Sequence, residues 1–121
     1  MRTKPDITRQ LQLRTRSVTV DEAGYVVDPE DWSSEFAEIV STLEGIELTD
    51  LHWATIEFMR TFLADHGIAA DARFVLKFLE ETQGLDKADA RELLFVLYPY
   101  GYVKQACKLA GMRQPRAWST G

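Results

Sequence analysis

The sequence lacks the features that mark several large classes of protein. Its 121 residues contain one cysteine, so no internal disulfide framework can form, and we expect a reducing, cytoplasmic location. No run of about 18 apolar residues occurs, which predicts that no segment spans a membrane. The first sixteen residues are polar and basic without an apolar stretch, so we expect no secretory signal.

Motifs for the common metal and enzyme chemistries are also missing. His52 and His66 lie fourteen residues apart and have no cysteine at ligand spacing, so we expect structural or surface roles for both. Each glycine stands alone rather than in a phosphate-binding loop. No serine lies in a nucleophile elbow. The residues therefore predict no bound metal and no recognised active site.

The net charge of −5 is distributed unevenly along the chain. Residues 1–20 and residues 93–121 each carry a charge of +4, whereas residues 21–92 carry −13. Basic ends on an acidic body can dock on that body or contact an anionic partner, and a plain solvated surface is the alternative. Arg113 and Arg116 are therefore candidate partner-binding residues, together with the N-terminal arginines.

Helical periodicity accounts for most of the chain after residue 28. Four predicted helices begin at a Ser, Thr or Asp that can cap them, and glycine follows most of the helix ends. The predicted helices cover residues 34–43, 50–65, 72–83, 86–97 and 102–110. We expect a core around Trp53, Phe58, Phe62, Val75, Leu79, Leu94 and Leu97. The pattern predicts one mainly α domain of about five helices.

A small β-hairpin is expected ahead of the helices. Val18 and Val20 on one side, and residues 25–27 on the other, flank a turn that contains Gly24. The expected organisation is a flexible basic arm at 1–16, the domain at 17–111 and a flexible C-terminal arm at 112–121.

Cys107 is the residue with the most distinctive chemistry. It lies in YPYGYVKQACKLAG, with Lys104 three residues earlier and Lys108 next to it. On an α-helix Lys104 shares the face of Cys107, and a nearby cation favours the thiolate that attacks sulfur and accepts a persulfide. A lone helical cysteine is otherwise a small buried hydrophobe. Both interpretations remain open at this point.

The helices at 72–83 and 86–97 are joined by Gly84 and Leu85, which is compatible with a helix-turn-helix. The second of these helices is not notably basic. An ordinary helical hairpin is the alternative, and nucleic acid is the less favoured partner.

The C-terminal stretch LLFVLYPYGYVKQACKLAGMRQP resembles the TusE/DsrC family, which comprises sulfur-relay proteins and gamma subunits of dissimilatory sulfite reductase. DEAGYVVDPEDW and IELTDLHWATIEFMRTF are similar to the family's hairpin-to-helix connection and long helix. The resemblance covers roughly 17–117. It implies a cytoplasmic helical domain with a mobile C-terminal arm, no bound cofactor, and sulfur handed between partner proteins as a persulfide or disulfide.

The chain departs from the family pattern at its C-terminus. The family's penultimate cysteine falls eleven residues after the position of Cys107, where this sequence has Trp118. The branch that serves tRNA thiolation keeps the terminal cysteine and lacks the upstream one, so this chain has the reverse arrangement. A disulfide between two arm cysteines is impossible with one sulfur atom. The chain therefore resembles a divergent member of the family.

These observations predict a sulfur-trafficking protein that uses Cys107 alone, as a persulfide site or an intermolecular disulfide partner. It would be at most a sulfurtransferase-type relay component, with sulfurtransferases and a sulfite reductase-like complex as partners. The alternative is a non-catalytic regulator that binds a protein partner or DNA, with Trp118 as an aromatic anchor. A purely structural module in a larger complex is a third hypothesis.

Overall fold

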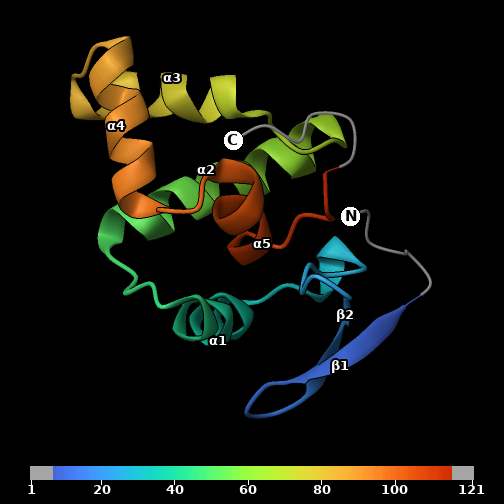
Figure 1. Ribbon diagram of the computed structural model, residues 1–121. Coiled ribbons are helices and arrows are strands. Elements are labelled where there is room, and N and C mark those ends of the chain that lie inside the picture. Colours follow the sequence, from blue (N-terminus) through green and yellow to red (C-terminus); the bar gives the residue numbers. More distant parts are fainter. Residues whose placement is uncertain (1–6, 116–121) are drawn as a thin grey trace.

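The computed structural model describes residues 7–115, which form a mainly helical domain with a small N-terminal hairpin (Figure 1). The strands are β1 (Thr8–Gln12) and β2 (Ser17–Asp21), and the helices are α1 (Ser34–Glu44), α2 (Asp50–His66), α3 (Ala72–Gln83), α4 (Lys87–Leu97) and α5 (Cys107–Leu109). A 3₁₀ turn covers Pro29–Asp31, and a π-helix, Tyr102–Ala106, leads into α5. The predicted fold class is confirmed. Within residues 7–115 no helix has both the length and the apolar character to cross a membrane.

Local capping explains why the four long helices begin where the sequence predicts. The N-cap side chains that accept a first-turn N–H are Ser33, Thr49, Asp71 and Asp86. The first three of these helices end at glycines with a positive φ, a conformation that costs glycine little. The residues that begin and end a helix lie next to it in the sequence, so they can be predicted from local sequence. The observed bounds of these four helices differ from the predicted ones by at most one residue.

The predicted hairpin forms, but the regular two-stranded sheet lies on its other side. Residues 25–27 pair with residues 19–21 through the antiparallel Val20–Val26 bridge and the backbone hydrogen bonds Asp21–Tyr25 and Val27–Thr19. β2 also pairs along its whole length with β1, which the sequence did not predict. β1 has the sequence TRQLQ and is largely exposed, so it carries no alternating apolar signal. Residues 8–12, within the predicted arm at 1–16, thus form a strand.

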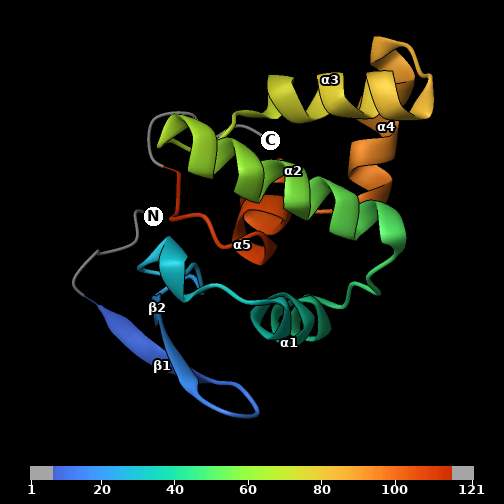
Figure 2. The same ribbon diagram turned by 180° about the vertical axis from the view of Figure 1, so that it is seen from behind.

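The segment that follows α4 occupies the middle of the molecule. Figures 1 and 2 show α5 between α2 and α1, while α3 lies on the opposite side of α2. α4 packs with α3 as a helical hairpin and runs from the end of α3 to the start of α2. Buried side chains of this segment include Tyr98, Tyr102, Cys107, Leu109 and Met112. Met112, the first residue of the predicted C-terminal arm, is thus part of the core.

The predicted core is correct on α3 and α4 and only partly correct on α2. Val75, Leu79, Leu94 and Leu97 are buried. Trp53, Phe58 and Phe62 are only half-buried. Ile56 and Met59 form the buried apolar part of α2 instead. This helix is apolar on two sides, and the sequence does not show which side faces the centre.

Candidate functional site

A π-helical turn places Cys107 at the centre of the domain. The chain leaves α4, passes Gly101 at φ 96°, and forms the π-helix before α5 begins. The N–H of Cys107 donates to the carbonyl of Tyr102, five residues earlier. This wider turn changes which side chains share a face with Cys107.

The thiol of Cys107 is fully buried. Burial is the main cause that raises its pKa to about 12 from an ordinary value near 9, and a side-chain hydrogen bond with Tyr102 acts in the opposite direction. At neutral pH the closed structure therefore holds a protonated thiol. The expectation that neighbouring lysines lower this pKa is wrong, because loss of solvation is the larger effect.

The two lysines nearest to Cys107 in sequence point elsewhere. Lys104 is exposed to solvent because the π-helical turn does not place it on the face of Cys107. The Nζ of Lys108 lies 3.2 Å from Oε2 of Glu44 and 5.3 Å from the ring centroid of Tyr25. Lys108 therefore ties α5 to the end of α1.

Side chains from earlier elements bind backbone carbonyls of the segment that carries Cys107 and of the last residue of α4. Tyr25 donates to the carbonyl of Val103 at 2.9 Å, and Trp32 donates to that of Leu109 at 2.9 Å. His52 donates to the carbonyl of Leu97 at 2.7 Å, and Arg60 donates to that of Ala110 at 3.2 Å. We call these four donors the carbonyl-binding set. Each bond joins residues at least 45 positions apart. These bonds hold the segment that carries Cys107 against elements from the first half of the chain.

Arg60 and Trp32 form a packed unit against the turn after α5. The guanidinium carbon of Arg60 lies 4.7 Å from the centroid of the Trp32 ring, and Arg60 also donates to the carbonyl of Gly111. A Cβ atom at Gly111 would lie 2.5–2.7 Å from Trp32, and its φ is +78°. Sequence reasoning missed Arg60 and Trp32, since no local pattern links them to this turn.

His52 has the structural role that its isolation in the sequence predicts. Its Nδ1 accepts the backbone N–H of Thr49 at 3.0 Å, and its Nε2 donates to Leu97. His66 is exposed and lies against the ring of Phe62. Among residues 7–115 no group of three or more His, Cys, Asp or Glu side chains could hold a metal ion.

The candidate arginines are only partly within the described residues. Nε of Arg113 donates to the carbonyl of Val27 at 3.1 Å, and its side chain is exposed. Arg14 forms ion pairs with Glu35 and Glu38 of α1, at 3.2 and 3.0 Å, so one N-terminal arginine docks on the acidic body. Arg116 and Trp118 lie outside the described residues.

Comparison with known proteins identifies relatives along almost the whole chain. The family model "DsrC like protein" matches residues 12–117. A sulfurtransferase TusE homolog of Haemophilus influenzae is 37% identical over 105 residues, which cover 87% of this chain and 95% of that protein. Sulfurtransferase TusE of Buchnera aphidicola is 39% identical over 95 residues, which cover 78% of this chain and 82% of that one.

Solved structures of DsrC proteins are also similar to this chain. The NMR structure of Allochromatium vinosum DsrC has a TM-score of 0.80 and 30% identity, and the match covers 93% of this chain and 99% of that one. The oxidized gamma-subunit of the dissimilatory sulfite reductase from Archaeoglobus fulgidus has a TM-score of 0.77 and 28% identity, with 91% and 99% covered. These relatives support a sulfur-relay function, and nothing among them supports the regulatory or DNA-binding alternative. The chain belongs to the family of DsrC-like proteins.

Proposed function

We propose that this chain is a sulfur-relay protein in which Cys107 takes one sulfur atom from the persulfide of a donor protein and passes it to an acceptor. The observation that carries the proposal is the position of the only cysteine, within the C-terminal segment of a DsrC-like fold. The cytoplasm is the compartment in which such a free thiol stays reduced.

The transfer is a thiol–persulfide exchange. The Cys107 thiolate attacks the outer sulfur of the donor persulfide, the donor's S–S bond breaks, and a new S–S bond forms on Cys107. The donor cysteine leaves as a thiolate and takes up the proton that Cys107 lost. One sulfur atom and one proton exchange places, so no external oxidant or reductant is needed.

Burial makes this exchange depend on opening of the segment around Cys107. The closed thiol is protonated and inaccessible, so the rate is the intrinsic rate multiplied by the fraction of molecules that are open. A partner that binds the open form increases that fraction. We propose that sulfurtransferases act as donors and that a sulfite reductase-like complex is one class of acceptor.

Exposed basic residues near Cys107 are the proposed contacts for these partners. Lys104 and Arg113 are exposed in the segment that carries Cys107, and Arg116 follows Arg113 in the sequence. Lys108 is held by Glu44, so its proposed role is to support α5. Trp118 stands where the family has its second cysteine, which limits the chain to one sulfur atom at a time.

Mass spectrometry of the full chain tests this proposal. After incubation with inorganic polysulfide, we expect a gain of one sulfur atom that a reductant removes and that Cys107→Ser abolishes. The matched control combines Cys107→Ser with Ser34→Cys, which moves the thiol to an exposed helix end. If the control gains sulfur while the wild type gains none, even in mild denaturant, relay through Cys107 is excluded.

A further inference from the structure

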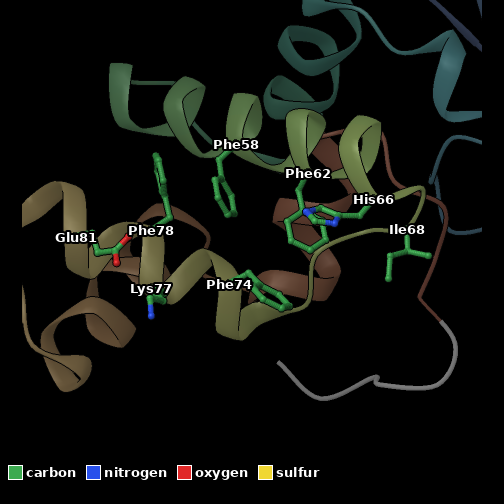
Figure 3. A pocket seen from close by; sticks show the side chains of 8 residues that line it. All are labelled: Phe58, Phe62, His66, Ile68, Phe74, Lys77, Phe78 and Glu81. Atoms are coloured by element: carbon green, nitrogen blue, oxygen red, sulfur yellow. The ribbon is translucent and has the colours of Figure 1, made fainter.

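An open apolar groove lies between α2 and α3, on the side of α2 that faces away from Cys107. It has a volume of about 570 Å³, and its apolar lining is Phe58, Phe62, Ile68, Phe74 and Phe78 (Figure 3). The ring centroids of Phe58 and Phe78 lie 4.7 Å apart, and those of Phe62 and Phe74 lie 4.9 Å apart.

The end of the groove near the α2–α3 connection is the more exposed one. Ile68 is 66% exposed and Phe74 is 44% exposed, and the His66 ring lies 4.2 Å from that of Phe62. A contiguous apolar surface of this kind marks a binding site more often than it stays in contact with water.

We propose that this groove binds the chain's own C-terminal segment, residues 116–121, with the indole of Trp118 against Phe62, Ile68 and Phe74. The proposal goes beyond the sulfur-relay function, because it concerns another face of α2 and does not involve Cys107.

The length of the chain allows this contact. Arg60 of α2 binds the carbonyl of Gly111, and six residues of helix, about 9 Å, separate Arg60 from His66. Seven residues from Gly111 to Trp118 span up to about 25 Å when extended. In Figures 1 and 2 the red chain after α5 rises towards the end of α2. The C-terminal segment can therefore pass round the end of α2 into the groove.

The chemistry of the segment fits the groove. Trp118 is the only large apolar residue after Met112. An indole packs favourably against phenylalanine faces and edges, and Phe62 and Phe74 present two tilted rings. A short tether gives an effective concentration in the millimolar range, so a contact with a dissociation constant below that range is occupied in most molecules.

Fluorine NMR of the full chain with fluorotryptophan tests the proposal. The chain contains three tryptophans, and the resonance that disappears in Trp118→Phe belongs to Trp118. We expect Phe74→Ser to move the Trp118 resonance towards that of a free peptide of residues 113–121. The matched control is Phe95→Ser, because Phe95 is 47% exposed on α4 and does not line the groove; it should leave the resonance unchanged.

Ile68→Ser, in a residue that is two-thirds exposed, provides a second groove variant with little risk to folding. A Trp118 resonance identical to that of the free peptide in the wild type would overturn the proposal. A resonance that changes on tenfold dilution would also overturn it, because a second copy would then supply the tryptophan. Cys107→Ser should leave the signal unchanged, so this test and the sulfur-uptake test fail independently.

Discussion

The two apolar sides of α2 end in different environments. Ile56 and Met59 are buried in the core, whereas Phe58 and Phe62, which line the groove beside α3, remain half-exposed. Figures 1 and 2 show α5 on one side of this helix and α3 on the other. Apolar character alone therefore does not determine which side of a helix becomes core.

Polar side chains account for part of this difference. The segment from Tyr98 to Gly111 contains a π-helix and a three-residue α-helix, which leave carbonyls without regular partners. Arg60 of α2 donates to the carbonyls of Ala110 and Gly111 in this segment, and His52 donates to that of Leu97, the last residue of α4. A buried carbonyl without a donor is costly. On the side that faces α3, the α2 residues that line the groove are Phe58, Phe62 and His66.

Truncating a buried side chain on α2 should lower the free energy of unfolding more than truncating one in the groove, and this is the largest effect that we expect. We expect Met59→Ala to lower the free energy of unfolding by about 3–4 kcal/mol, because the side chain is fully buried. Phe62→Ala should cost about 1–2 kcal/mol, because Phe62 is only half-buried in the groove. Urea denaturation measures both values. Equal losses would remove the distinction between the two sides.

The turn after α5 should be the next most sensitive position. Gly111→Ala should cost about 2–4 kcal/mol, since it combines a positive φ with a clash against Trp32. Gly84→Ala is the matched control: its φ is +65°, and a Cβ there meets nothing within 4 Å. We expect a loss of about 1 kcal/mol for the control. A similar loss at both positions would show that the contact with Trp32 is not tight.

Removal of one donor from the carbonyl-binding set should have an intermediate effect. Arg60→Met keeps much of the contact with Trp32 and removes the hydrogen bonds to Ala110 and Gly111, for an expected loss of about 1–2 kcal/mol. Arg73→Met is the control, because Arg73 is exposed and pairs only locally with Asp71. Thermal or urea unfolding of the pair gives the comparison. An Arg60 variant as stable as the control would contradict the role of this set.

The smallest predicted effect is the contribution of the buried Cys107 thiol to the pH dependence of the free energy of unfolding. The thiol of the unfolded chain loses its proton above about pH 9, while the folded thiol keeps it up to about 12, so stability falls as the pH rises through this window. Between pH 9 and 10 this contributes a loss of about 1 kcal/mol. Tyr98, whose pKa burial also raises to about 12, adds to the decline from about pH 10. Cys107→Ala should make the curve flatter between pH 9 and 10, and parallel curves would contradict a buried thiol.

The helices could be predicted because their signals are local. A cap such as Thr49 and a stop such as Gly67 lie within a few residues of the helix that they delimit. β1 could not be predicted, because its polar residues pair with β2 while facing solvent.

The environment of Cys107 depends on features that sequence spacing does not encode. The π-helical turn moves Lys104 off the expected face, and Arg60 reaches its partners from about 50 residues away. Burial of Cys107 is one of the two interpretations that the sequence leaves open, because a lone helical cysteine can be a small buried hydrophobe. The role of Cys107 in sulfur transfer stays a prediction.

The rate at which a small thiol reagent labels Cys107 tests the account most directly. We predict that the native chain at pH 7.5 reacts at least about 100-fold more slowly than the unfolded chain, because the segment must open first. Arg60→Met should increase the native rate, while Phe74→Ser in the groove should leave it unchanged. Labelling of the native wild type as fast as of the unfolded chain would contradict the claim that opening of this segment controls the sulfur chemistry of Cys107.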